Sequence, residues 1–300
     1  MDATSKRCRE ATFERSGRGG QFGEVRRFGG FAIFLLPAQP PLLFKEGNGL
    51  RFNHVMSTII LILALVQSIQ DVTTSANADF KAGRWADAAA KYETVLKENG
   101  SDLPSRFKLA VCYSRLGNVE AAIAAYQTLL TQDAAIYEAR VNLGILLAQH
   151  GRRKEASEQF ERAVPLLVEA VKSEPSNADY LYLLGKSYEQ LKAFPQAITA
   201  LEQAIRIKAD HVEAYETLAT VFYSQKNWAR AAQVLSRVIE LQPRDALPHF
   251  GLATCLDNLG NAKEAIVQYN QFLEFDDGSN DARSFQARQR AKTLERRLKR

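Results

Sequence analysis

The chain has 300 residues, of which 46% are hydrophobic and 24% charged, a balance typical of a globular protein. Its three cysteines are too few for a disulfide framework, and we interpret Cys112 and Cys255, which occupy equivalent places in a repeat, as small buried core residues. The net charge of +5 divides into +4 over residues 1–55, −5 over residues 56–279 and +6 over residues 280–300. The central part is therefore mildly acidic and both ends are basic.

Residues 1–55 differ in composition from the rest of the chain. Glycine and arginine are frequent, three prolines fall at 37, 40 and 41, and no apolar period is sustained. This composition indicates a disordered arm, or an extension that is not part of the natural product because translation starts later, for example at Met56.

Residues 56–68 contain an uninterrupted apolar run, Ile59–Val66. The run is too short to cross a bilayer comfortably, but it has the length of a secretory signal. Val66 and Ser68 are acceptable to signal peptidase, so the mature chain would begin at Ile69 and the protein would be exported to the periplasm or envelope of a bacterium. The alternative is that the run is the buried first helix of the folded domain downstream, in a cytoplasmic protein.

Residues 69–279 repeat every 34 residues. Gly83, Gly117 and Gly151 lie 34 apart, and each is followed after five residues by an alanine and after nine by an aromatic residue. A small residue also recurs seven or eight positions before the break, and it follows a leucine: Leu109-Ala110, Leu143-Gly144, Leu184-Gly185, Leu218-Ala219 and Leu252-Ala253. Self-similarity at this period indicates an array of stacked units.

Each unit has the pattern of two short helices joined by a turn, with apolar positions three and four apart in both halves. The small residues have a steric reason, because helices cross closely only where one of them carries almost no side chain. One hairpin cannot bury its apolar faces alone, so neighbouring units must stack. The predicted units lie near 69–102, 103–136, 137–177, 178–211, 212–245 and 246–279.

These columns resemble the tetratricopeptide repeat, as Leu143, Gly144, Ala156, Phe160 and Ala163 illustrate. The resemblance implies an all-α, right-handed superhelical solenoid of about six helix hairpins. The departures from the family pattern are local: Lys192 and Lys226 replace the turn glycine, and Asp79 occupies a place that is usually apolar.

The third unit carries seven extra residues at 164–174. Seven residues are about two helical turns, so the second helix could lengthen without rotating its apolar face. Pro165 would kink a continuous helix unless a new helix starts there. The insertion is either a protruding lip for a partner or a tolerated lengthening.

Catalytic patterns are not found. The four histidines, at 54, 150, 211 and 249, lack metal-ligand spacing, and we interpret each as a surface or packing residue. No nucleophile is paired with a base. We therefore expect no enzymatic activity, no cofactor and no metal.

Function is then expected on a surface. The resemblance implies that the first helix of each unit lines a concave groove that binds a segment of a protein partner. The predicted groove residues are Phe107, Val111, Val141, Ile145, Tyr182, Lys186, Tyr223 and Phe250. The alternatives are that these side chains only support packing or that the protein's own tail covers them, and that the chain is a structural or assembly subunit of an envelope or secretion complex.

Residues 280–300 predict a basic capping helix. Ala287, Ala291, Leu294 and Leu298 recur at helical spacing among many basic residues, and a terminal repeat needs a polar outer face. The helix could make weak contact with an anionic partner or surface. Aromatic residues are not interleaved with its basic residues, so nucleic-acid binding is not favoured.

Overall fold

The computed structural model describes residues 49–278 and 281–299, with side chains at 57–59 and from residue 67 onward. This part of the chain is all helical. In chain order the helices are α1 (Gly49–Lys81), α2 (Trp85–Glu98), α3 (Leu103–Arg115), α4 (Val119–Gln132), α5 (Tyr137–Gln149), α6 (Arg153–Ser173), α7 (Ala178–Gln190), α8 (Phe194–Ile207), α9 (Val212–Ser224), α10 (Trp228–Leu241), α11 (Ala246–Asn258), α12 (Ala262–Phe275) and α13 (Asp281–Leu298).

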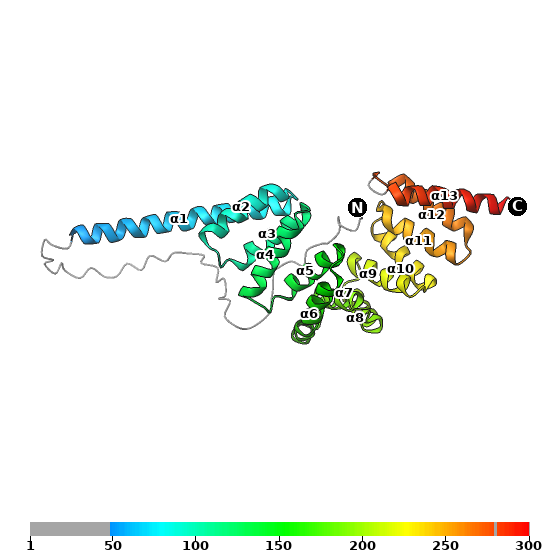
Figure 1. The fold of residues 1–300 in the computed structure, drawn as a ribbon, viewed down its shortest axis with the longest axis horizontal. Coiled ribbons are helices and arrows are strands. Elements are labelled where there is room, and N and C mark those ends of the chain that lie inside the picture. The colour runs from blue at the N-terminus through cyan, green and yellow to red at the C-terminus, as the bar shows by residue number, and fades with distance from the viewer. Residues whose placement is uncertain (1–48, 279–280, 300) are drawn as a thin grey trace.

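The helices form six successive hairpins, α1–α2 to α11–α12, and α13 packs on α12. They follow an arch that descends from α1–α4 to α6–α8 and rises again to α11–α13 (Figure 1). First helices of consecutive units also touch directly, α1 with α3, α5 with α7 and α7 with α9. Such contacts place the first helices on the inner side of the curve, where neighbouring units approach most closely. The predicted solenoid is confirmed.

The break inside each hairpin has a left-handed backbone. Gly83, Gly117 and Gly151 have φ angles of 72°, 75° and 78° in the first three units, and Lys192 and Lys226 have φ angles of 59° and 56° in the fourth and fifth. Glycine adopts this conformation without steric cost, whereas a side chain makes it unfavourable. The two lysines that replace the turn glycine therefore keep its geometry under strain.

Small residues let the helices of a hairpin approach. A Cβ built on Gly144 would lie 2.8 Å from Cζ of Phe160, and one on Gly185 would lie 2.6 Å from Cγ of Leu201. Carbon atoms that are not bonded to each other do not pack at such distances. The glycine that follows the leucine in these two units therefore allows the close helix crossing that the sequence predicted.

The insertion of the third unit lies inside a single helix. α6 runs unbroken from Arg153 to Ser173, 21 residues against the 14 of α4 and α8. Pro165 is exposed within it, and Leu167, one turn from Ala163, is buried like Ala163 itself. The two added turns therefore keep the apolar face of α6 packed on the rest of the array, as expected for a seven-residue insertion.

α1 continues upstream of the predicted start of the array. Figure 1 shows it extending beyond the end of α2 as a lone helix. Ile59 is exposed in this extension, whereas Ala76, opposite α2, is fully buried. No helix in the described ranges is long and apolar enough to span a membrane. Export and the late translation start stay predictions, and residues 1–48 of the predicted extension lie outside the described residues.

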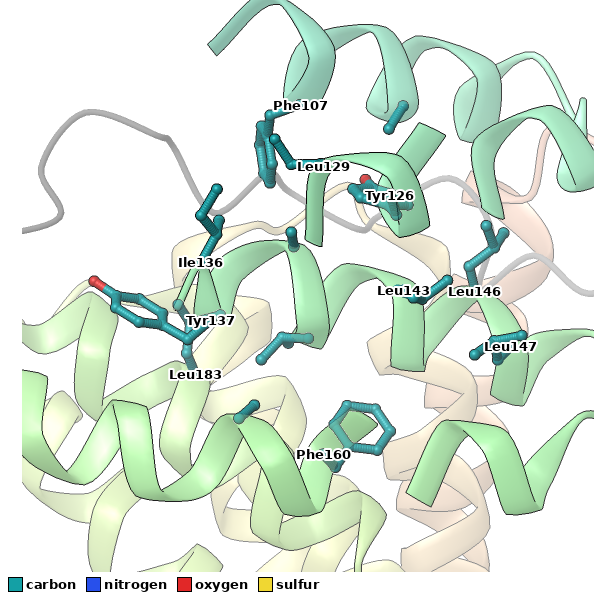
Figure 2. Packing of buried hydrophobic residues seen from close by; sticks show 14 of the residues in the cluster. Phe107, Tyr126, Leu129, Ile136, Tyr137, Leu143, Leu146, Leu147, Phe160 and Leu183 are labelled. Carbon is teal, nitrogen blue, oxygen red and sulfur yellow. The ribbon is translucent and has the colours of Figure 1, made fainter. Parts of the chain in front are cut away.

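The largest apolar cluster joins the second, third and fourth units. Figure 2 shows its packing around Phe107, Tyr126 and Phe160.

At the carboxy-terminal end of the array, the predicted capping helix is confirmed. Ala287, Ala291 and Leu294 of α13 share a cluster with Tyr269 and Phe272 of α12. Cys112 and Cys255 are buried, as the sequence predicted.

Candidate functional site

The inner face of the arch is the candidate site, because the first helices α3, α5, α7, α9 and α11 carry all eight predicted groove residues. Their side chains are not equally accessible. Phe107 and Val141 are 1% and 0% exposed, so both belong to the core. Phe107 meets the ring of Tyr126 edge to face, with centroids 6.0 Å apart. For these two residues the structure shows the packing role that the sequence left open as an alternative.

A small pocket opens between α3 and α5. Its apolar floor includes Ile145 and Leu146, and its rim is polar. The lining residues are Val111, Ser114, Arg115, Tyr126, Asn142, Ile145, Leu146 and Gln149. Two of the predicted groove residues, Val111 and Ile145, therefore meet at one place. Val111 is itself buried, so Ile145 is the more accessible of the two.

The remaining predicted residues lie farther along the array, on α7, α9 and α11. Tyr182 and Lys186 of α7 are partly buried, and Lys186 Nζ lies 3.6 Å from Glu189 Oε2. Tyr223 of α9 is exposed, and its ring meets Trp228 edge to face. Phe250 of α11 packs against the rings of Tyr269 and Phe272 at 5.9 and 5.1 Å. Of the eight predicted groove residues, Val111 and Ile145 share a pocket, and Phe107 and Val141 are part of the core.

A charged cluster joins α7 to the start of α9. The buried imidazole of His211 has Nε2 3.3 Å from Asp179 Oδ1 and Nδ1 3.2 Å from Glu213 Oε2. Neither contact is a well-aligned hydrogen bond, and both become ion pairs when the imidazole is protonated. The ring of His211 also lies 5.0 Å from the ring of Tyr182, centroid to centroid. A predicted groove residue is therefore in contact with a titratable group that connects two units.

Electrostatics in this cluster favour the charged form of the histidine. Burial lowers the pKa of His211, but its contacts with Asp179 and Glu213 raise it by more, so the pKa lies above its ordinary value. The same contact with His211 holds the pKa of Asp179 below its ordinary value, against the opposing effect of burial.

Glu138 is a second titratable group that the sequence did not single out. It lies in the first turn of α5 and is only 3% exposed, and its Oε2 atom makes no hydrogen bond. Burial raises the pKa of its carboxyl to about 7. Glu138, Asp179 and Glu213 occupy the same column of three successive units. This periodic spacing of acids is visible in the sequence, but it does not reveal the contact of Asp179 and Glu213 with His211.

No group of three or more His, Cys, Asp or Glu side chains is placed to hold a metal in the ranges that the structure describes.

Tetratricopeptide repeat models match residues 73–135, 107–163, 148–212 and 222–288, which together are more than half of the chain. The chain belongs to the tetratricopeptide repeat family. Tetratricopeptide repeat arrays are generally protein–protein interaction scaffolds.

Solved tetratricopeptide repeat structures agree with this assignment. The chain is similar to a protein of the APC/C hetero-tetramer Cut9–Hcn1, with a TM-score of 0.63, 15% identity and coverage of 75% of this chain and 42% of that one. It is also similar to PilF of Pseudomonas aeruginosa, with a TM-score of 0.54, 18% identity and coverage of 74% and 98%. Identities this low show the fold alone. No curated protein sequence matches the chain.

Proposed function

We propose that the chain is a non-catalytic scaffold that binds a segment of a protein partner along the inner face of the array, with the pocket between α3 and α5 as the anchor. The observation that carries the proposal is this pocket, in which the partly buried Ile145 lies beside Asn142 and Gln149. An apolar floor with a few polar groups on the rim is the usual construction of a recognition pocket. It suits an apolar side chain of an extended or helical segment whose backbone meets the rim.

The experiment is selection of random peptides displayed on phage against the full chain, followed by affinity measurement. Ile145→Glu should weaken the selected peptides by tenfold or more, because a carboxylate would stand on the apolar floor. The matched control is Val267→Glu, which places the same charge on an exposed aliphatic position of α12. This control should leave binding unchanged.

The outcomes distinguish the possible binding sites. Peptides that bind equally well to the wild type and to Ile145→Glu would refute the anchor. Binding that survives Ile145→Glu but disappears when Arg296, Arg297 and Lys299 become alanine would transfer the site to α13. A dependence on the lone extension of α1 would instead favour the alternative that the chain is an assembly subunit, and intact-mass measurement of the native protein would show whether that extension is retained.

A further inference from the structure

His211 is a buried titratable group at the junction of the fourth and fifth units, and the scaffold function proposed above does not use it. It precedes α9 as the residue at its N-cap, and its side chain makes no capping hydrogen bond to that helix. Its ring instead lies between a carboxylate of α7, Asp179, and a carboxylate of its own helix, Glu213. The contact therefore bridges two units of the array.

Each ring nitrogen of His211 lies close to a carboxylate oxygen. A neutral imidazole has one N–H and one lone pair, so it can serve only one of two acceptors. With Asp179 Oδ1 at 3.3 Å and Glu213 Oε2 at 3.2 Å, the lone pair of a neutral ring would face a carboxylate oxygen. The imidazolium form offers N–H to both carboxylates, so this arrangement fits the protonated ring.

The two charged groups that contact the ring are both carboxylates. Asp179 from α7 and Glu213 from α9 face it, and Lys208, at the end of α8, acts on Asp179. Glu213 is mostly buried, whereas the Asp179 side chain is 68% exposed. Loss of the proton from His211 would leave two carboxylates close together with no cation between them, and the exposed Asp179 is the one able to move away.

We propose that His211 is a pH-sensitive latch: its protonation holds α7 against α9, and its deprotonation loosens this junction and the part of the groove around Tyr182. The consequence for partner binding rests on the scaffold function proposed above. The latch itself does not depend on it. Tyr182 carries the effect because its ring lies against the ring of His211.

The direction in which the latch responds to pH follows from the pKa shifts of His211 and Asp179. The pKa of His211 is raised on folding, so its contribution is complete below the unfolded pKa of about 6.5 and is lost as the pH rises through the folded pKa. The pKa of Asp179 is lowered, so its contribution is present above about 3.9 and is lost as the pH falls through the folded pKa. The latch is therefore closed in mildly acidic solution and opens as the pH rises through the folded pKa of His211.

The first test is an NMR titration of the imidazole protons of the full chain, which has four histidines, with the His211 signal assigned by its absence in His211→Asn. The pKa of His211 should exceed 6.5 and should fall in Asp179→Asn. The exposed Asp179 tolerates this substitution. Asp210→Asn removes the same charge from the exposed neighbouring residue and should leave the titration unchanged. A wild-type pKa at or below 6.5, or one that Asp179→Asn leaves unmoved, would overturn the latch.

The second test is hydrogen exchange of the full chain at pH 6 and pH 8.5, corrected for the intrinsic rates. Amides in α7 and in the first turn of α9 should lose about tenfold protection for each pKa unit by which folding raises His211, while amides in α3 and α5 should not change. In Asp179→Asn the difference between the two pH values should shrink. Equal protection at both pH values in the wild type would refute the proposal. Neither test uses a partner, so their failure and the failure of the peptide selection are distinguishable.

Discussion

The inner face has an amino-terminal half, α3 and α5, and a carboxy-terminal half, α7, α9 and α11, and its groove residues are packed differently at the start of each half. In the amino-terminal half, Phe107 and Val141 fill the groove column and belong to a continuous apolar cluster. In the fourth unit the same column holds Tyr182, whose ring lies against that of the titratable His211, whereas Phe250 in the sixth unit again packs on apolar rings. Apolar contacts do not titrate, whereas ion pairs around a histidine do. A single repeat column can therefore serve as core in one unit and as part of a titratable junction in another.

The largest expected effect separates the two halves directly. Phe107→Ala should lower the free energy of unfolding by about 3–5 kcal/mol, because it empties a fully buried position against Tyr126. Tyr182→Ala, at the same place in its unit, should cost less because its side chain is only partly buried. Urea unfolding at pH 6 measures both. Equal losses would mean that the two halves do not differ in how deeply this column is packed.

The close contact between the two helices of a hairpin should be equally sensitive to an added methyl group in the third and fourth units. Gly185→Ala should destabilise by about 1–3 kcal/mol, since its methyl group would lie 2.6 Å from Cγ of Leu201 and 3.3 Å from the carbonyl oxygen of Ala197. Gly144→Ala should cost a similar amount against Phe160. Gly251→Ala is the matched control, because its nearest atom, Cδ1 of Leu235, is 3.2 Å away. A neutral result at Gly185 would show that the helices of the fourth unit can separate without loss.

Glu138, in the first turn of α5, should make stability depend on pH. Its carboxyl has a pKa raised to about 7 by burial, so its unfavourable ionisation is absent below its unfolded value and develops as the pH rises to about 7. Glu138→Gln should therefore raise the free energy of unfolding at pH 8 by about 1–2 kcal/mol and have little effect at pH 4.5. Urea unfolding at both pH values measures this. If Glu138→Gln instead lowered the free energy of unfolding at pH 8, the ionised carboxylate would not be destabilised by burial.

The sequence predicted the fold because the repeat columns report local steric needs. The small residues at Gly144 and Gly185, the turn at Gly117 and the apolar face of α13 each follow from spacing within one or two helices. The depth to which the groove residues are buried could not be predicted from this spacing. Spacing identifies which face of α3 carries Phe107, but the curvature of the array decides how deeply neighbouring units cover that side chain.

The charged contacts could not be predicted for a related reason. His211 and Asp179 are 32 residues apart, and their contact depends on the offset between units, which no pattern inside a unit specifies. Asp79 is an intermediate case. The sequence marked it as a departure from an apolar place, and the structure shows it buried with ion pairs to Arg84 and Lys91, which hold the pKa of its carboxyl below the ordinary value.

The smallest expected effect concerns the turns, where the fourth and fifth units differ from the other four, since the sixth unit turns at Gly260. The first three units turn at glycine, and the fourth and fifth turn at Lys192 and Lys226 with φ near 60°. Lys226→Gly should relieve the left-handed strain of about 1 kcal/mol, but the unfolded chain gains freedom, so the net stabilisation should be about 0.5 kcal/mol. Thermal unfolding of the full chain measures it.

Gly117→Ala is the reciprocal control for that prediction. No atom lies within 4 Å of the added Cβ, and the φ angle is 75°, so its cost, about 1 kcal/mol, would be conformational alone. If Lys226→Gly destabilised the chain while Gly117→Ala behaved as expected, the Lys226 side chain would make a contribution that outweighs its backbone strain. The lysine turns would then be a stabilising feature of the fourth and fifth units and not a tolerated departure from the repeat.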